Sequence, residues 1–272
     1  MQFVFTPSHQ ALRPFVNGYY YIELDAGPDA RPLDIHPVGY HTMAFTLNSR
    51  QVFRSTASEY DFNLSYHGLI CEHISLFPMA PKINMVVVSF TSTGASRLFG
   101  VSQHQLINQI HPIEDIVPEA MDLKLRLEDG ISCGMRAIDL IEHWLLRRIS
   151  AKSPFRYGPN IDRACSLIQR HRGIIPIGEL SREVGMSQRY LESHFKDMIG
   201  TTPKMYCRIV RFLAAYQFIL GNDDVDWGEL IYRHQFFDQS HFIHDFKRFF
   251  GRSPSKIHLA NSHLAGKIAL EL

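Results

Sequence analysis

Two nine-residue stretches of this 272-residue chain are near copies of each other. Residues 195–203 read FKDMIGTTP and residues 246–254 read FKRFFGRSP, so that Phe, Lys, Gly and Pro recur 51 positions apart. Leu191 and Phe242 precede the two Phe residues by four positions and share that offset. The chain therefore holds two versions of one structural unit, and the fold of its C-terminal part must accommodate both.

The first copy has the pattern of two short helices joined by a tight turn. Residues 177–184 predict the first helix, Gly185 fits the turn, and Ser187 is a typical N-cap of the second helix. The spacing i, i+4, i+7 gives that second helix a buried face made of Leu191, Phe195 and Met198. Such a helix-turn-helix can place its second helix in the major groove of DNA.

The second copy repeats this arrangement. Residues 227–234 predict its first helix, Asp238 its N-cap, and residues 239–249 its second helix. Between the copies, residues 204–220 predict a single helix about 26 Å long, at about 1.5 Å per residue. Adjacent major grooves on one face of B-DNA lie about 34 Å apart, so a rigid helix of this size can hold two reading units near that spacing. The tandem arrangement favours duplex DNA as the partner.

This part of the chain resembles the paired helix-turn-helix domain of AraC/XylS-type transcription regulators. The matching residues are Leu180, Gly185, Met186, Ser187, Leu191, Phe195, Lys196, Gly200, Pro203, Arg211 and Ala215 in the first unit and the connecting helix, and Phe236, Asp238, Gln239, Ser240, His241, Phe242, Phe246, Lys247, Gly251, Arg252, Ser253 and Pro254 in the second. The resemblance covers about 40% of the chain. It implies a sequence-specific activator or repressor, RNA polymerase as a partner, and an N-terminal domain that senses a ligand or mediates dimerisation.

The second copy departs from the family pattern at two positions. Gln235 stands in the turn where the family usually has Gly, and Ile231 replaces a small residue of the preceding helix. Gly at such a turn supplies a positive φ and allows close approach of the backbone. If one unit binds DNA weakly, we expect it to be the second.

Base-reading side chains are expected on the exposed N-terminal part of each second helix. The candidates are Gln188, Arg189, Glu192 and Ser193 in the first unit, and Gln239, Ser240, His241 and His244 in the second. Arg189 can bind guanine O6 and N7, and Gln188 can read adenine, whereas Glu192 and the histidines also fit ordinary surface positions. Phosphate contacts, which add affinity without sequence preference, are expected from Lys196, Lys247, Arg248, Arg252 and Ser253.

The first ninety residues have the pattern of a β-rich domain. Short aromatic or apolar runs are separated by turn-forming residues, such as those at 25–29, and predict strands at 15–24, 43–47, 68–71 and 84–90. An antiparallel, cupin-like barrel or sandwich with helices, followed by an all-α domain, gives an α+β fold class. The expected parts are a sensor or dimerisation domain at 1–112, a helical connector and linker at 113–159, and the double helix-turn-helix domain at 160–262.

Helical patterns begin after residue 90. Helices are predicted at 94–99, at 102–108 with Ser102 as N-cap, at 135–149 as an amphipathic helix, and at 161–171 with Asn160 as N-cap; residues 151–160 read as a linker. The apolar face of the amphipathic helix packs either on its own domain or against a second copy of the chain. A homodimer is therefore one expectation.

A ligand of the N-terminal domain would be expected among its aromatic residues. The candidates are Tyr19, Tyr21, Tyr40, Phe45 and Trp144, which equally fit a plain hydrophobic core. Alternation along an extended chain would put His67, Cys71 and His73 on one strand face, yet their spacing matches no closed zinc site. We expect neither a metal nor a cofactor.

Charge and composition narrow the class of protein. Residues 1–154 carry 12 Lys and Arg against 15 Asp and Glu, whereas residues 155–258 carry 15 against 11, which fits an acidic partner for the C-terminal part. No apolar run reaches the roughly 18 residues of a membrane span, and no export signal is recognisable. The four Cys lack CxxC spacing, as in reduced cytoplasmic proteins.

Two alternatives remain beside a ligand-responsive regulator. In one, the N-terminal domain only dimerises or binds another protein. In the other, the chain is an enzyme with an appended DNA-binding domain, as in some DNA-repair methyltransferases. Because no Pro-Cys-His-Arg motif, nucleophile elbow or phosphate-binding loop occurs in the sequence, we expect a regulator without enzymatic activity.

Overall fold

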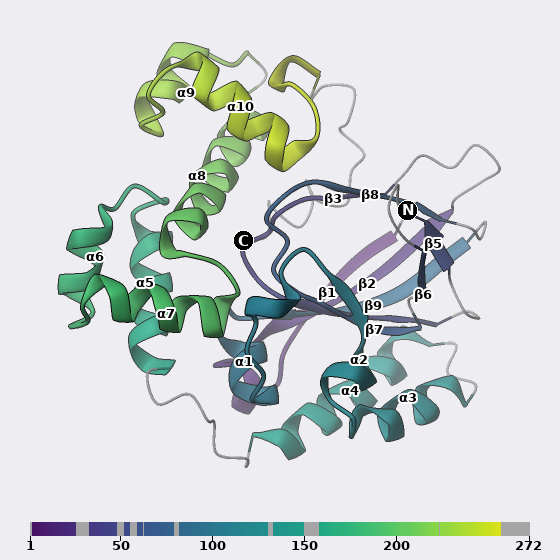
Figure 1. The fold of residues 1–272 in the computed structure, drawn as a ribbon. Helices are drawn as coiled ribbons and strands as arrows, with labels where there is room; N and C mark the ends of the chain where they lie inside the picture. Colours follow the sequence, from purple (N-terminus) through teal and green to yellow (C-terminus); the bar gives the residue numbers. More distant parts are fainter. Residues whose placement is uncertain are drawn as a thin grey trace.

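The computed structural model describes residues 2–25, 33–47, 52–54, 59–61, 63–78, 82–129, 133–149, 158–222 and 224–256. Within these ranges a sheet-rich N-terminal part precedes an all-helical C-terminal part, as the sequence predicted (Figure 1). Most of the predicted turn at 25–29 and of the predicted linker at 151–160 lies outside the described residues. No helix among the described residues is long and apolar enough to cross a membrane.

The larger sheet has six antiparallel strands. Their order is β1 (Gln2–Pro7), β2 (Val16–Asp25), β9 (Lys82–Phe90), β4 (Thr42–Thr46), β7 (Leu64–His67) and β10 (Ile110–Pro112). The predicted strands at 15–24, 43–47 and 84–90 are β2, β4 and β9, which lie side by side at its centre. Their aromatic and β-branched side chains form the core, with Phe45 opposite Val86 and Tyr19 opposite Val88.

A smaller sheet completes the N-terminal part. Its strands lie in the order β3 (Leu33–Ile35), β8 (Ile74–Pro78), β5 (Val52–Arg54) and β6 (Glu59–Asp61). The prediction of a strand at 68–71 is wrong, because β7 ends at His67 and residues 68–71 have no regular secondary structure. A Cβ at Gly68 would lie 1.7 Å from the carbonyl oxygen of Leu106, so the backbone of this segment packs against the 3-10 turn that ends at Leu106.

The irregular conformation also separates the residues that were expected on one strand face. His67 ends β7, whereas Cys71 and His73 follow in chain without regular structure. Among the described residues, no cluster of three His, Cys, Asp or Glu side chains could hold a metal ion.

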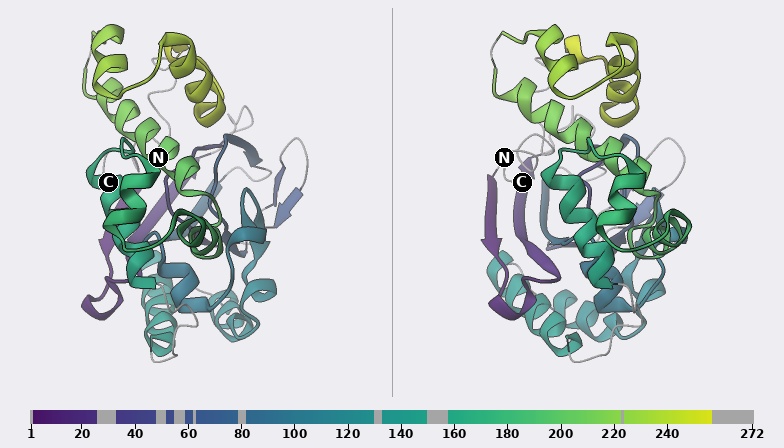
Figure 2. Two further views of the ribbon diagram at one scale, coloured as in Figure 1. Left: turned by 60° about the vertical axis from the view of Figure 1, so that its left-hand side comes forward. Right: turned by 90° about the vertical axis from the view of Figure 1, so that its left-hand side faces the viewer.

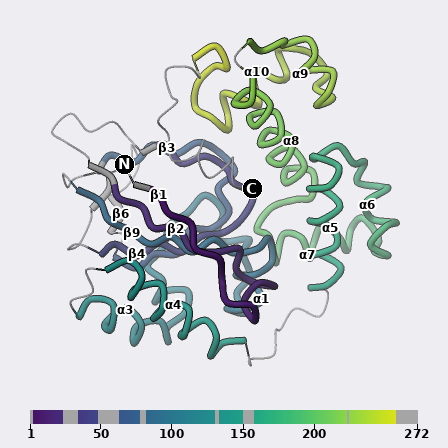
Figure 3. Tube along the Cα trace, turned by 180° about the vertical axis from the view of Figure 1, so that it is seen from behind, coloured from purple at the N-terminus to yellow at the C-terminus, as the bar shows by residue number. Residues whose placement is uncertain are grey.

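Among its described residues, the N-terminal part has four α-helices: α1 (Gly94–Phe99), α2 (Ile113–Ile116), α3 (Ala120–Glu128) and α4 (Gly134–Arg148). A 3-10 turn, η1 (Gln10–Leu12), follows β1. The predictions for α1 and α4 are confirmed, but residues 102–108 contain only the 3-10 turn η2 (His104–Leu106). The inner face of α4, with Ile138, Ile141 and Leu145, belongs to the same core as the strands. This face therefore packs on its own domain; α3 and α4 lie together along one side of the sheet (Figures 2 and 3).

Within residues 158–222 and 224–256 the C-terminal part has six helices: α5 (Gly158–Arg170), α6 (Ile177–Glu183), α7 (Gln188–Ile199), α8 (Pro203–Leu220), α9 (Trp227–Arg233) and α10 (Gln239–Phe250). Helix α8 connects two units, α6–α7 and α9–α10, which lie near its opposite ends (Figure 1). Asn160 is not the N-cap of α5, because the helix begins two residues earlier. Its side chain instead donates a hydrogen bond to the carbonyl oxygen of Val184, 2.9 Å away.

The two parts are packed against each other. Leu69 and Cys71 belong to the hydrophobic core of the C-terminal helices. The hydroxyls of Ser92 and Tyr206 lie 2.8 Å apart, and the backbone N–H of Gln103 donates to the carbonyl of Asp197 at 2.7 Å. The helix-turn-helix units are thus held against the N-terminal sheet.

Candidate nucleic-acid interface

The turn of the first unit has the geometry that its sequence predicts. Gly185 adopts φ +66°, and the hydroxyl of Ser187 accepts a hydrogen bond from the backbone N–H of Tyr190, which caps α7. Leu191 and Phe195 are fully buried, so the opposite face of α7 is left to solvent. That face is the one that can enter a DNA groove.

The four base-reading candidates of the first unit are all exposed on α7: Gln188, Arg189, Glu192 and Ser193. The amide of Gln188 lies over Gly178 of α6, since its Nε2 would be 3.1 Å from a Cβ at that position. Lys196, one turn further along the helix, is half-buried. The structure thus brings the four reading candidates together at the N-terminal end of one helix.

The turn of the second unit is formed in the same way, despite Gln235. Gln235 adopts φ +50°, the left-handed conformation that Gly185 has in the first turn. The backbone N–H of Met186 donates to Ser181 at 3.0 Å, and that of Phe236 donates to Ile231 at 3.1 Å, which are equivalent hydrogen bonds. The second unit therefore keeps the turn at the cost of a strained residue.

The reading candidates of the second unit differ in exposure. Asp238 caps α10 by accepting from the backbone N–H of His241 at 2.7 Å. Gln239, Ser240 and His244 are exposed, whereas His241 is partly buried, with its ring 5.7 Å from that of Phe236. The second unit thus presents a smaller free polar face than the first.

Asp245 is a residue of this unit that sequence reasoning missed. Its carboxylate is almost fully buried, and it lies 2.6 Å from Nη2 of Arg208 in α8 and 3.6 Å from Nε2 of His241. The ion pair between Asp245 and Arg208 connects α10 to α8, and the same carboxylate lies beside the ring of the candidate His241. Asp245 directly precedes the repeated Phe246, whereas the equivalent residue of the first copy is His194. Comparison of the two copies therefore did not mark Asp245 as important.

The phosphate candidates of the second unit lie near the end of α10. Lys247 is exposed and Arg248 is half-buried. Ser253 shares a hydrogen bond with Ser255 at 3.1 Å. The guanidinium of Arg252 donates to Oδ2 of Asp34 at 3.0 Å, so this candidate is engaged by the N-terminal part.

Asp34 is the centre of a docking contact between the two parts. It accepts hydrogen bonds from Nε2 of His73 at 2.9 Å and from the hydroxyl of Ser75 at 2.8 Å. Burial raises the pKa of Asp34, but the hydrogen bonds from His73 and Ser75 outweigh it and hold the pKa at about 2. The contact therefore contains a carboxylate that is charged at neutral pH.

Backbone and ring contacts extend the docking contact along the end of α10. The backbone N–H of His73 donates to the carbonyl of Arg248 at 3.0 Å. His36 stacks on Phe250, with ring centroids 4.4 Å apart, and its Nδ1 lies 3.2 Å from the carbonyl oxygen of Phe249. No local pattern marks these partners, because they are 175 or more residues apart in the sequence.

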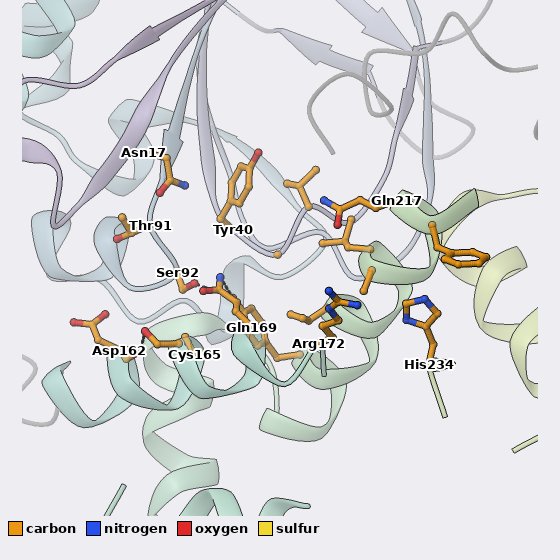
Figure 4. Close-up of a pocket in the computed structure, with 18 of the residues that line it drawn as sticks. Asn17, Tyr40, Thr91, Ser92, Asp162, Cys165, Gln169, Arg172, Gln217 and His234 are labelled. Atoms are coloured by element: carbon orange, nitrogen blue, oxygen red, sulfur yellow. Dashed lines mark hydrogen bonds between the residues drawn. The ribbon is translucent and has the colours of Figure 1, made fainter. Parts of the chain in front are cut away.

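The aromatic ligand candidates do not meet in one place. Tyr19, Phe45 and Trp144 are buried in the core of the N-terminal part, and Tyr21 packs beside Gly134 of α4. Tyr40 lines a cavity of about 930 Å³ between the two parts of the chain, whose other walls include Gln169 of α5 and Gln217 of α8 (Figure 4). The ligand-binding role of the five aromatic residues stays a prediction.

Comparisons with known proteins fit these two parts. A family model described as a helix-turn-helix domain matches residues 180–258, and one described as a domain of unknown function (DUF6597) matches residues 4–112. The probable thc operon regulatory protein of Rhodococcus erythropolis is 32% identical over 84 residues, which are 30% of this chain and 25% of that protein. The chain thus matches about a quarter of that relative's length.

Two solved structures share the fold. Both are of ToxT from Vibrio cholerae, one of them bound to (E)-4-(8-methylnaphthalen-1-yl)but-3-enoic acid. Each is 10% identical to this chain, with a TM-score of 0.50 over 89% of this chain and 97% of the other. At this identity the likeness shows the fold alone: a sheet-rich part followed by a helical helix-turn-helix part.

Proposed function

We propose that this chain, whose residues 180–258 form a helix-turn-helix domain of the AraC type, is a transcription regulator that binds specific sequences of duplex DNA. One observation carries the proposal: two helix-turn-helix units with equivalent turn hydrogen bonds lie near opposite ends of α8. This helix has 18 residues and is roughly 27 Å long, which suits two neighbouring segments of major groove.

The four exposed side chains at the start of α7 and the four at the start of α10 are the proposed base readers. The proposed phosphate contacts are Lys196, Lys247, Arg248, Arg252 and Ser253. Because the first unit has an unstrained glycine turn and four exposed candidates, it is the stronger reader. Because Arg252 donates to Asp34, this proposed phosphate contact becomes fully available only when the two parts separate locally.

The N-terminal part is the proposed site of control. The packing of both units against it allows a small molecule, or a partner protein, to change how α7 and α10 are presented. A structure with the same fold carries a bound small molecule, which supports control by a small molecule rather than by a partner protein. RNA polymerase and a second copy of the chain complete the proposed partners. We further propose that the chain works in the cytoplasm, where its DNA is, and that it catalyses no reaction.

In vitro selection of duplexes by the full-length protein tests the proposal. The expected result is an enriched motif with two short elements about one helical turn apart, since each unit reads one segment of groove. If the selected motif occurs twice, as an inverted or direct repeat, the protein binds DNA as a dimer. Failure to enrich any motif would contradict sequence-specific binding. An Arg189→Ala variant, selected in parallel, should lose information in one element only.

A further inference from the structure

The second unit has one residue more than the first between its turn and its reading helix. Residues 185–187 lead from the turn to the N-cap in the first unit, and residues 235–238 do so in the second. The backbone N–H groups of Met186 and Phe236 make equivalent hydrogen bonds, so the extra residue is Phe237. Phe237 therefore has no counterpart in the first unit.

The ring of Phe237 lies in solvent. Its side chain is 90% exposed, the highest value among the large hydrophobic residues that the structure describes. A residue directly before the N-cap often packs on the fourth residue of the helix, which here is Phe242. That place is filled by Phe236, which is buried, with its ring 5.0 Å from that of Phe242. The packing of α10 therefore does not depend on Phe237.

The backbone at Phe237 is held although its ring is free. Its N–H donates a hydrogen bond to Nδ1 of His241 at 3.4 Å. The next residue, Asp238, accepts from the backbone N–H of His241 at 2.7 Å. Both contacts are made with the first turn of α10. The ring is therefore presented from a fixed backbone at the N-terminal end of this helix.

The ring of His241 has partners for both of its nitrogens. Because Nδ1 accepts from Phe237, the neutral ring carries its proton on Nε2, which lies 3.6 Å from Oδ2 of Asp245. Asp245 is held in turn by Arg208 at 2.6 Å. Both nitrogens thus face groups of the protein, and neither is left for a base edge. His241 is better placed to position Phe237 than to read DNA.

The surroundings of Phe237 are polar and exposed, and include Gln239, Ser240 and His244. A single exposed apolar side chain is common at protein surfaces, so exposure alone assigns no role. The position does, because the N-terminal end of a reading helix is the part that reaches base edges. Thymine alone among the four bases carries a methyl group in the major groove, and Phe is one of the side chains that contact it.

We infer that Phe237 is a specificity-determining residue, which contacts the C5 methyl group of a thymine in the element that the second unit reads. The inference rests on the proposed function and narrows it. Gln239, two positions later, can bind N6 and N7 of adenine, so the two side chains together favour A·T base pairs. Contact between ring and methyl group removes apolar surface of both from water. His241 is a positioning residue that acts through the backbone of Phe237.

Replacement of thymine by deoxyuridine tests the inference, because it removes the methyl group and keeps the base pair. Fluorescence anisotropy compares the selected duplex with duplexes that carry one deoxyuridine each, all titrated with the full-length protein. The element of the second unit is the one that Arg189→Ala leaves unchanged in the selection. One substitution in that element should weaken the wild type about three- to fivefold, as expected for one buried methyl group. The same substitution should have no effect on Phe237→Ala.

Two further readouts separate this contact from damage to the fold. Tyr232→Ala removes an aromatic side chain of similar exposure, 87%, from α9 and should keep the full deoxyuridine effect. Phe237→Ala should unfold at the wild-type temperature, because the ring is exposed, and should keep the salt dependence of binding, because no charge is removed. An equal deoxyuridine effect in the wild type and in Phe237→Ala would overturn the inference.

The positioning role of His241 has a matched pair of variants. His241→Asn keeps an acceptor near the N–H of Phe237 and should retain the deoxyuridine effect. His241→Ala removes the acceptor and should reduce the effect to less than twofold. An undiminished effect in His241→Ala would refute the positioning role.

The same experiment separates failure of the inference from failure of the proposed function. If no motif is enriched, the proposed function fails and the inference fails with it. If a motif is enriched but the element of the second unit lacks thymine, only the inference is overturned. The same holds if no deoxyuridine in that element weakens binding by the wild type, since sequence-specific binding would then stand without the methyl contact.

Discussion

The guanidinium of Arg252, just after α10, donates a hydrogen bond to the carboxylate of Asp34 in β3, 218 positions earlier in the chain, at 3.0 Å. The same side chain is a candidate for contacting DNA phosphate. The Nη2 group that donates to this carboxylate is less available to a phosphate, and the negative charge of Asp34 repels a phosphate that approaches the same guanidinium. Docking of α10 on the N-terminal part and phosphate binding by Arg252 therefore compete.

We expect Asp34→Asn to raise the affinity for duplex DNA by roughly two- to fivefold at low salt, because the released guanidinium can reach phosphate. Fluorescence anisotropy with a labelled duplex at two salt concentrations measures this. The double variant Asp34→Asn/Arg252→Ala should lose the gain. A gain that persists without Arg252 would show that the competition lies elsewhere.

Arg189 and Lys247 should differ in the kind of loss that they cause. Arg189→Ala should cost about 1–3 kcal/mol on the selected duplex and relax one base position, because a bidentate base contact is removed. Lys247→Ala should weaken all sequences alike and reduce the salt dependence by about one phosphate contact. Titrations on a selected and a scrambled duplex decide. Equal losses on both for Arg189→Ala would remove it from the readers.

Local signals predicted the structure of the two helix-turn-helix units well. Ser187 and Asp238 cap their helices as expected, and Leu191 and Phe195 are buried, because caps and helical periodicity depend on residues within one or two turns. Residues 68–71 were wrongly predicted as a strand. The conformation at Gly68 depends on close packing against the backbone of Leu106, 38 residues later, and the apolar pattern of residues 68–71 does not report that contact. Asp34 was missed for the same reason, because its contacts are with residues that are distant in the sequence.

Gln235 should respond to substitution according to the backbone that it adopts. At φ +50°, Gln235→Val should destabilise the protein by about 1–2 kcal/mol, because a β-branched side chain clashes in the left-handed region. Gln235→Gly relieves the strain of the folded state but raises the conformational entropy of the unfolded chain. Because the two effects oppose each other, the free energy of unfolding should stay within about 1 kcal/mol of the wild-type value. Urea unfolding measures both. A Val variant as stable as the Gly variant would contradict the strain.

Buried His41 should make the protein sensitive to mild acid. Burial lowers its pKa from 6.5 to about 4, so the unfolded chain takes up a proton at a higher pH than the folded chain does. The stabilising contribution is complete above about pH 6.5 and is lost as the pH falls through 4, on the order of 3 kcal/mol. The fall of the urea midpoint between pH 7.5 and 4.5 should be smaller in His41→Phe, but it should not vanish, because burial also lowers the pKa values of His67 and His234 to about 4. The exposed control His244→Phe should keep the wild-type slope.

Gly251 and Gly185 form a matched pair that isolates the docking contact. Both adopt a left-handed conformation, with φ +79° and +66°, so an alanine at either position brings a similar backbone strain of about 1 kcal/mol. A Cβ at Gly185 meets nothing within 4 Å, whereas one at Gly251 would lie 2.5 Å from Nδ1 of His73. Only Gly251→Ala therefore displaces the ring that donates to Asp34.

Gly251→Ala should consequently be less stable than Gly185→Ala by about 1 kcal/mol or more in urea unfolding of the full-length protein, since it also disrupts the His73–Asp34 hydrogen bond. In hydrogen exchange, the backbone amide of His73, which donates to Arg248, should lose protection in Gly251→Ala and keep it in Gly185→Ala. Equal stability and equal protection in the two variants would show that the end of α10 is not held by this contact.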